Sequence, residues 1–452
     1  MSSGENHLSE LAQDIVRRAV AAGAADAECT IEEGDEFSAN VRMRELENLK
    51  EAGSRAAGLR IVRGQRTGSS YTSDLSEEGI ARLVKSAIEL ADVTTDDPHA
   101  GLPEPEELGA IAGDLGLFSA DVDTLDTEGR IALARRAESA ALDADPRITN
   151  SEGASFDSYA GRHIFANSRG FAGDYRSSSC SLSVVPVAKD GESMERDFWY
   201  HSSRSLGRLE APEQIGRTAA ARALRRLNPV KVATQKVPVV FEPRVAASLV
   251  ESLFEAVHGM MIYRHESFLA GKLGERVASE KLSLIDDATV PGGFGTSPFD
   301  DEGVASRRTV VIEDGVLKSY LLNTYAARKL GMKTTGNASR GLTGNAGIGH
   351  GNFFIANGVL PPERIIAQIA DGFYVTELIG MGVNIVTGDY SRGAVGLWIR
   401  NGELAFAVSE VTIAGKLQDM LMGVEQVGND LEFRGSVAAP TLKIGEMTVG
   451  GK

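Results

Sequence analysis

Cysteine and long apolar runs are scarce in this chain of 452 residues. The two cysteines, Cys29 and Cys180, are too few and too far apart to form a disulfide framework, which fits a reducing compartment. No apolar run approaches the roughly 18 residues that a membrane-spanning helix requires. The first residues also lack the basic segment and apolar core of a secretory signal. These absences predict a cytoplasmic protein without a membrane segment.

Positive charge is also in short supply. The formal net charge is −16 and the sequence pI is near 5.1, which opposes binding to a polyanion such as nucleic acid. The densest basic patch lies on a predicted helix at Arg217, Arg222, Arg225 and Arg226. We interpret this patch as a solvated helix face and expect no direct contact with nucleic acid.

Histidines are few and are not spaced as metal ligands. A hydrolytic zinc site needs about three protein ligands and a nearby carboxylate that acts as a base. None of the seven histidines stands four or five residues from another, the spacing that places two ligands on one helical face. His265-Glu266 opens like a zinc-protease motif, but Leu269 and Ala270 stand where a second histidine would be needed. We therefore predict no metal and no cofactor in this chain.

The length predicts more than one core, and the pattern of elements changes near residue 230. Before it, helices predicted at residues 7–22, 76–91, 127–143 and 212–227 mix with antiparallel strands, which is an α+β pattern. Residues 230–236 resemble a linker. After it, most segments read as strands with tight turns. We expect an N-terminal α+β domain (1–230) and a β-rich C-terminal domain (237–452).

Local signals mark several boundaries. Ser76 is the predicted N-cap of the second helix, and Pro243 suits the first turn of another helix. Glu313-Asp314-Gly315 and Asn401-Gly402 are typical hairpin turns. The glycine-rich residues 336–351 predict a mobile loop and lack the lysine of a phosphate-binding loop.

Two further segments carry chemistry. Asp300-Asp301-Glu302 places three carboxylates side by side, although adjacent acids on a loop usually stay solvated. Residues 388–393 gather Asp389, Tyr390, Ser391 and Arg392 between two glycines, beside apolar strands. This arrangement suits a binding loop on a rigid scaffold, and a structural turn network would use the same groups equally well. The segment Gly295-Thr-Ser297-Pro-Phe299 begins like the nucleophile elbow of a serine hydrolase, but Phe299 stands where that turn needs glycine.

Several of these segments, in the same order, resemble the TldD/PmbA family. The resemblance spans the whole chain and is most specific in segments that include Thr296-Ser-Pro-Phe-Asp-Asp-Glu-Gly303, residues 320–331, Thr387-Gly-Asp-Tyr-Ser-Arg-Gly393 and residues 409–415. One branch of that family carries a zinc-protease helix with a His-Glu-x-x-x-His pattern. The matching helix here reads Glu251-Ser-Leu-Phe-Glu-Ala256, without a histidine at either ligand position. The cysteine that completes the zinc site in that branch is also missing near residues 426–429, so the chain resembles the metal-free (PmbA, or TldE) branch.

The resemblance implies curved, barrel-like sheets in the C-terminal domain and a cytoplasmic complex of two subunits. In such a complex a zinc-bearing TldD-like paralogue would supply metal and base, while the present chain closes a chamber and holds an extended peptide. The family trims modified peptide precursors, degrades unfolded peptides and includes proteins described as modulators of DNA gyrase. Candidate residues of the cavity are Glu251, Arg264, Asp300, Asp389, Tyr390, Ser391 and Arg392, with none of them catalytic.

Two alternatives remain at this point. The chain could act alone as a peptide-binding adaptor or homodimer, or it could be a metalloprotease with unrelated ligands such as His258, His265 and Glu266. On the replaced helix we expect the Glu251 and Ala256 side chains to face the cavity. Val250, Leu253, Phe254 and Val257 should then pack against the core.

Overall fold

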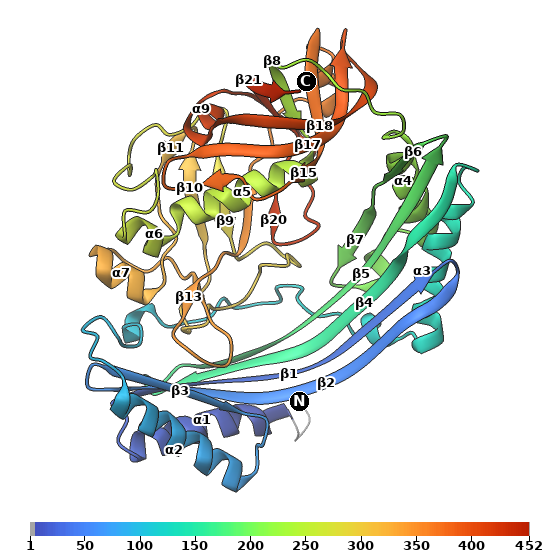
Figure 1. The fold of residues 1–452 in the computed structure, drawn as a ribbon. Coiled ribbons are helices and arrows are strands. Elements are labelled where there is room, and N and C mark those ends of the chain that lie inside the picture. The colour runs from blue at the N-terminus through green and yellow to red at the C-terminus, as the bar shows by residue number, and fades with distance from the viewer. Residues whose placement is uncertain (1–4, 452) are drawn as a thin grey trace.

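The computed structural model describes residues 5–451 and divides them between a long curved sheet and a β-rich C-terminal part (Figure 1). The N-terminal elements are α1 (Glu5–Ala21), β1 (Asp26–Arg42), β2 (Glu45–Arg63), β3 (Arg66–Thr72), α2 (Glu77–Val93), α3 (Thr127–Leu142), β4 (Ile148–Asn167), β5 (Ala172–Asp190), β6 (Ser193–Arg196), β7 (Trp199–Ser203) and α4 (Pro212–Leu224). The strands form one antiparallel sheet in the order β3-β2-β1-β4-β5-β6, and β7 also pairs with β5.

Two separate cores lie on the convex face of this sheet. The helices α1 and α2 cover one end, where Ile15, Ile31 and Leu59 are buried. The helices α3 and α4 cover the other end, around Phe156 and Ile215. Side chains alternate between the two faces of a strand, so the neighbours of these apolar residues point to the concave face. The concave face therefore carries the residues between them, such as Glu28 and Ser38.

The C-terminal part contains two larger sheets and one hairpin. Its elements are β8 (Gln235–Phe241), α5 (Pro243–Val257), α6 (Gly259–Tyr263), β9 (Leu284–Asp287), β10 (Arg308–Glu313), β11 (Val316–Leu317), α7 (Thr324–Leu330), β12 (Ala338–Ser339), β13 (Gly347–Ile348), β14 (Asn352–Ile355), α8 (Pro362–Ile366), β15 (Asp371–Ile379), β16 (Val383–Asn384), β17 (Asp389–Arg400), β18 (Glu403–Lys416), α9 (Leu417–Met422), β19 (Val424–Val427), β20 (Val437–Ala438) and β21 (Leu442–Gly450). The order β15-β8-β21-β18-β17 closes on itself because β15 also pairs with β17. The predicted α+β fold with curved, barrel-like sheets is confirmed.

The helix cap at Ser76, the helix start at Pro243 and the turn at Asn401-Gly402 are confirmed. The Ser76 hydroxyl accepts a hydrogen bond from the Gly79 amide, and α5 begins at Pro243. The β17–β18 turn holds Asn401 at φ +51° and Gly402 at φ +82°, values that suit asparagine and glycine. The glycine-rich residues 336–351 contain the β12–β13 hairpin and are not a free loop. Among residues 5–451, no helix is long and apolar enough to cross a membrane.

Ion pairs join α4 to the C-terminal part. Arg222 is buried and donates to Glu242 at 2.5 Å, while Arg226 is buried and donates to Glu377 at 2.5 Å. The prediction of a solvated face is wrong for these two arginines, because their guanidinium groups pair with carboxylates beyond the end of the helix. Part of the basic patch therefore connects the N-terminal part of the chain to the C-terminal part.

Candidate functional site

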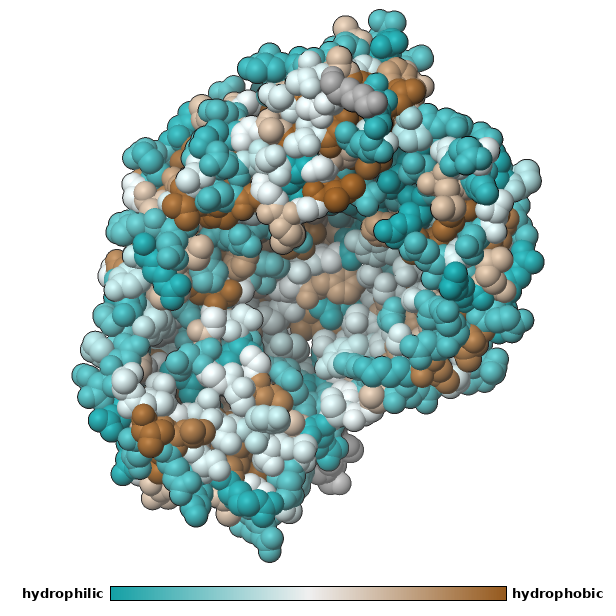
Figure 2. All heavy atoms as spheres, viewed as in Figure 1, coloured by the Kyte–Doolittle hydropathy of each residue, from teal (hydrophilic) through white to brown (hydrophobic). Residues whose placement is uncertain are grey.

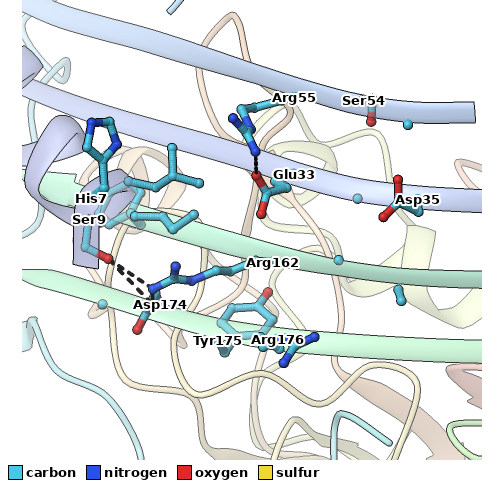
Figure 3. Close-up of a pocket in the computed structure, with 18 of the residues that line it drawn as sticks. His7, Ser9, Glu33, Asp35, Ser54, Arg55, Arg162, Asp174, Tyr175 and Arg176 are labelled. Carbon is cyan, nitrogen blue, oxygen red and sulfur yellow. Dashed lines mark hydrogen bonds and ion pairs between the residues drawn. The ribbon is translucent and has the colours of Figure 1, made fainter. Parts of the chain in front are cut away.

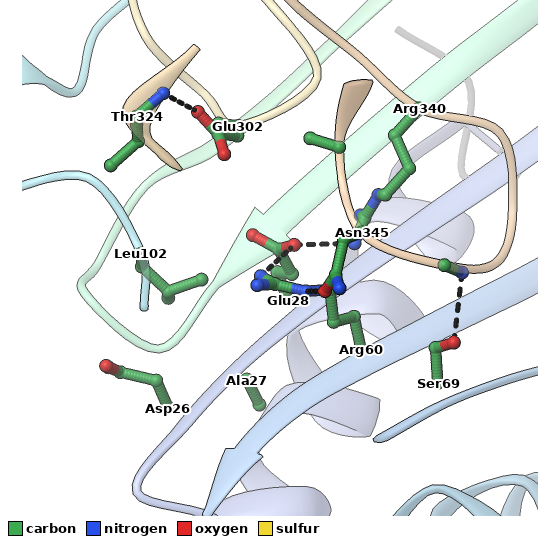
Figure 4. A network of polar contacts seen from close by, with 12 residues as sticks. Asp26, Ala27, Glu28, Arg60, Ser69, Leu102, Glu302, Thr324, Arg340 and Asn345 are labelled. Atoms are coloured by element: carbon green, nitrogen blue, oxygen red, sulfur yellow. Dashed lines mark hydrogen bonds and ion pairs between the residues drawn. The ribbon is translucent and has the colours of Figure 1, made fainter. Parts of the chain in front are cut away.

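The two halves meet through a buried polar network on the concave face of the sheet (Figure 4). Glu28 on β1 is fully buried, and its Oε1 accepts hydrogen bonds from Arg60 at 2.9 Å and from Arg340 at 2.5 Å. Arg60 on β2 also donates to the Asn345 side chain at 2.8 Å. Because Arg340 and Asn345 belong to the β12–β13 region, this network fastens the hairpin to the N-terminal sheet.

Asp300, a predicted cavity residue, lies inside this contact region. Its carboxylate accepts hydrogen bonds from the amides of Glu302 at 3.0 Å, Val304 at 2.9 Å and Ala338 at 2.9 Å. Burial and the nearby charge of Glu302 hold the pKa of Asp300 well above its usual range. With its oxygens committed to backbone amides, Asp300 holds a turn against β12.

Asp300 is one of the residues that line a small polar cavity of about 160 Å³. Its lining includes Tyr175, Ser297, Phe299, Asp301, Ser306, Asn337, Ser339 and His350. Nearby, Asp286 on β9 accepts hydrogen bonds from the Asn337 side chain and the Gly351 amide, both at 2.7 Å. Burial raises the pKa of Asp286 to about 6. This carboxyl group can therefore change its charge near neutral pH.

The helix α5 was expected to face a cavity through Glu251 and Ala256. Glu251 is exposed, but Ala256 has no exposed surface and belongs to the C-terminal core, so the expectation for Ala256 is wrong. Its methyl group packs with Leu253 and Val257 because the core-facing stripe of α5 is wider than the sequence pattern suggested. Val250, Leu253 and Val257 are buried in that core and Phe254 packs against it, as predicted.

The Phe254 ring contacts two histidines. Its centroid lies 4.8 Å from that of His350 and 5.8 Å from that of His258, in edge-on geometry. The C-terminal strand β20 packs against the same helix. Within residues 5–451, no group of three or more His, Cys, Asp or Glu side chains is placed to hold a metal. The hydrocarbon side chains of Phe254 and Ala256 carry no atom that could coordinate zinc.

The segment from Asp389 to Arg392 is a strand and not a loop. Because it starts β17, its side chains alternate, and the four predicted residues do not converge on one site. Asp389 is exposed and pairs with Lys416 at 2.8 Å, which lowers its pKa together with a hydrogen bond from Thr387. Tyr390 is buried, its hydroxyl has no hydrogen-bond partner, and burial raises its pKa.

The remaining predicted residues lie at the surface or near it. Ser391 is exposed, and Arg392 is half-buried on the same side of the strand as Tyr390. Arg264 follows α6, is exposed, and lies 3.9 Å from the Glu266 carboxylate. Hence Glu251, Arg264, Asp300 and the 389–392 segment occupy different places, and no single pocket collects them.

A polar groove that sequence reasoning missed lies on the concave face. Its volume is about 480 Å³, and Figure 2 shows a recess between the two halves of the molecule. The lining includes Glu36, Ser38, Lys50, Asp157, Tyr159, Ser179, Ser181, Ser202 and Phe294. Ser38 donates to Asp157 at 2.6 Å, and Lys50 pairs with Glu36 at 3.2 Å. Serine at every second residue from 177 to 183 is the sequence signal that marks this face.

A larger depression of about 1360 Å³ lies on the convex face beside α1 (Figure 3). Its floor carries Glu33, Asp35, Arg55, Arg162 and Asp174. Arg55 pairs with Glu33, and Arg162 pairs with Asp174. The carboxylates of Glu33 and Asp174 are therefore each compensated by an arginine of the same depression.

Three family models match successive parts of the chain. They describe the PmbA/TldA metallopeptidase domain 1 (residues 27–91), central domain (120–227) and C-terminal domain (234–451). The metalloprotease PmbA of Escherichia coli O157:H7 is 40% identical over 435 residues, which is 96% of this chain and 94% of that protein. A PmbA homologue of Haemophilus influenzae is 35% identical over 100% of this chain and 98% of its own length.

Solved structures agree with this relationship. A protein of Bacteroides thetaiotaomicron described as a candidate modulator of DNA gyrase superposes with a TM-score of 0.91 at 28% identity, covering 100% of both chains. TldE from Thermococcus kodakarensis has the same fold, with a TM-score of 0.89 at 23% identity over 98% of this chain and 100% of its own. On its sequence, its fold and the order of its matched parts, the chain belongs to the PmbA/TldD family, whose relatives are named as metalloproteases.

Proposed function

We propose that this chain is the non-catalytic subunit of a cytoplasmic TldD/PmbA-type zinc metalloprotease complex. Its partner is a zinc-bearing TldD-like paralogue, and the complex processes modified peptide precursors and degrades unfolded peptides. The observation that supports the proposal is α5, where the positions that match the two histidine ligands hold Glu251, which is exposed, and Ala256, which is buried in the core and carries no atom that could bind a metal.

The contribution of this chain to the complex is substrate binding. The groove on the concave face is lined by hydroxyl and carboxylate groups, which can bind the amide groups and the basic side chains of an extended peptide. The groove suits cationic side chains of a peptide. Lys50 is already paired with Glu36, whereas the Asp157 carboxylate accepts a hydrogen bond from the neutral hydroxyl of Ser38. Metal, water and base come from the partner.

Co-expression with the zinc-bearing paralogue of the same genome tests the proposal. The two chains should co-purify in equal amounts, and an unstructured peptide should be cleaved by the pair but by neither chain alone. Cleavage by the present chain alone, with zinc bound, would refute it. Failure of the two chains to co-purify would refute the complex.

A groove variant tests the binding role. In the complex of the two chains, Asp157→Asn should raise the KM for a lysine-containing peptide several-fold and leave kcat nearly unchanged. The reason is that the substitution weakens binding of the peptide equally in the ground state and in the transition state. Asp35→Asn, a carboxylate on the convex face, is the matched control. An equal effect of both variants would show that the groove does not select substrate.

The alternative function is a stand-alone peptide-binding adaptor or homodimer without proteolytic activity. The hydroxyl and carboxylate groups of the concave groove would serve peptide binding in this case too. Under this alternative the chain would bind unstructured peptides alone as tightly as the pair does, and the paralogue would not co-purify.

A further inference from the structure

An aromatic ring lies across two glycines inside the polar groove of the concave face. Gly34 on β1 stands directly opposite Gly161 on β4. A Cβ atom added at Gly34 would lie 2.7 Å from Cε2 of Tyr159, and one added at Gly161 would overlap the Tyr159 hydroxyl oxygen. An aromatic side chain that covers strand glycines in this way supports the sheet. The Tyr159 ring is therefore held against the backbone, in space that the missing side chains leave free.

Carboxylates surround this ring on the same face of the sheet. Glu36 is directly opposite Tyr159 in the β1–β4 register, and Asp157 precedes it by two residues on β4. Directly opposite residues have Cβ atoms roughly 4.5 to 5.5 Å apart, and residues two apart on a strand share a face. All three side chains line the groove. Burial and the charges of Glu32 and Glu36 raise the pKa of Tyr159, so the ring lies in a negative field.

Two basic side chains lie in or beside this groove. Lys50 pairs with Glu36 at 3.2 Å, but the two side chains are 63% and 55% exposed. Such an exposed pair contributes little to stability, so a ligand can take the place of Lys50. The Arg204 guanidinium lies over the Phe294 ring and donates to the carbonyls of Gly293 and Phe294. Neither contact engages the β4 carboxylate beside the ring.

We propose that Tyr159, Glu36 and Asp157 form a subsite for the guanidinium group of an arginine side chain in an extended peptide. The subsite rests on the proposed function in one respect, because it requires that the concave groove holds the peptide. A guanidinium group can stack on the Tyr159 ring and donate in its own plane to the carboxylates beside the ring. A lysine ammonium is a compact, strongly hydrated charge and gains less from the ring. Tyr159 is thus the residue that selects arginine over lysine.

Peptide binding to the full chain, without the paralogue, tests the subsite. Three fluorescent peptides of glycine and serine carry one arginine, one lysine or one citrulline at the same central position. Fluorescence anisotropy should show that the arginine peptide binds roughly three- to tenfold more tightly than the lysine peptide. Citrulline keeps the planar group without the charge, so its peptide should bind at least about tenfold more weakly than the arginine peptide.

Variants of the ring assign the preference to Tyr159. Tyr159→Leu should bring the affinities for the arginine and lysine peptides within about twofold of each other, because leucine offers no ring. Tyr159→Phe covers the same glycines and should keep the preference. Tyr71→Leu is the matched control, because Tyr71 is 63% exposed on β3 of the same sheet and lies outside the groove. Both affinities are measured on one preparation, so a smaller folded fraction of a variant leaves their ratio unchanged.

A charge variant separates the carboxylates from the ring. Glu36→Gln leaves the ring in place and changes an exposed side chain. It should weaken the arginine and lysine peptides alike, by roughly fivefold, because both use the carboxylate. Unchanged affinity for both peptides would overturn the subsite.

Other results also overturn the subsite. These are equal affinities of the native chain for the arginine and lysine peptides, a preference that survives Tyr159→Leu, and a preference that Tyr71→Leu abolishes as well. The subsite and the protease complex can fail separately. A preference that depends on Tyr159, in a chain that does not co-purify with the paralogue, would uphold the subsite and refute the complex. Cleavage by the two chains together, without any preference for arginine in binding, would refute the subsite alone.

Discussion

Glu28 on β1 and Arg340 in the β12–β13 hairpin form a buried ion pair with 2.5 Å between carboxylate and guanidinium, although 312 residues separate them in the chain. Both side chains are buried, and Arg60 shares the same carboxylate oxygen. The pair is therefore a fastening between the two halves of the molecule.

Removing Arg340 should destabilise the protein strongly. Arg340→Ala leaves Glu28 buried with one partner fewer, and breaking a buried pair in this way costs about 3 kcal/mol. Urea unfolding measures the change in the free energy of unfolding. Arg66→Ala, which removes an exposed pair with Asp96, should cost less than about 1 kcal/mol and serves as the control. Equal losses in both variants would contradict a special role for the buried pair.

The stability of the protein should respond to the charge of Asp286. Its pKa in the folded chain is raised to about 6 from 3.8, so the stability that its neutral form contributes is full below about pH 4 and is lost as the pH rises through 6. The expected loss is on the order of 3 kcal/mol. Asp286→Asn removes this titration. The difference in the free energy of unfolding between the native chain and the variant should change between pH 4 and pH 7. If the two plots of unfolding free energy against pH ran parallel, they would contradict a raised pKa of Asp286.

Replacing Phe254 should create a metal site. In Phe254→His, a third imidazole would stand beside His258 and His350, at ring separations compatible with shared coordination. Elemental analysis after dialysis should find about one zinc per chain in this variant, and none in Phe254→Ala. Zinc in both variants, or in neither, would show that His258 and His350 do not converge.

The variant Glu251→His with Ala256→His should behave differently. An imidazole at position 256 overfills a closed core and buries a polar ring, which should cost about 3 kcal/mol or more. Thermal unfolding should show a lowered Tm without added zinc affinity. A stable, zinc-binding double variant would mean that α5 can turn this face toward the cavity.

Tyr390 should be dispensable as a hydrogen-bonding group. Its buried hydroxyl has no partner, so Tyr390→Phe should leave the free energy of unfolding unchanged or raise it by up to about 1 kcal/mol. Tyr320→Phe is the matched control, because its hydroxyl donates to the Leu269 carbonyl at 2.8 Å and its loss should cost about 1 kcal/mol. Chemical unfolding of both variants distinguishes the two tyrosines.

Local chemistry alone determined many element boundaries. Ser76 caps a helix, Pro243 begins one, and Asn401-Gly402 turns a hairpin, because each depends on the conformational preferences of a few adjacent residues. The order of family segments also sufficed to predict the α+β fold. By contrast, residues 45–55 of β2 are all exposed and show no alternation of apolar and polar residues, so the sequence pattern does not predict that half of the strand.

Only the tertiary structure decided where the chemistry lies. Sequence proximity suggested that Asp389, Tyr390, Ser391 and Arg392 act together, but a strand directs neighbouring side chains to opposite faces. The groove around Asp157 and Ser181 collects residues from β1, β2, β4, β5 and β7 with Phe294 from the C-terminal part, and no short window of sequence contains them. The sequence by itself determined the local elements and the family, since these depend on neighbours along the chain. The buried network of Glu28 and the burial of Ala256 depend on which strands and halves pack together, which the folded chain alone decides.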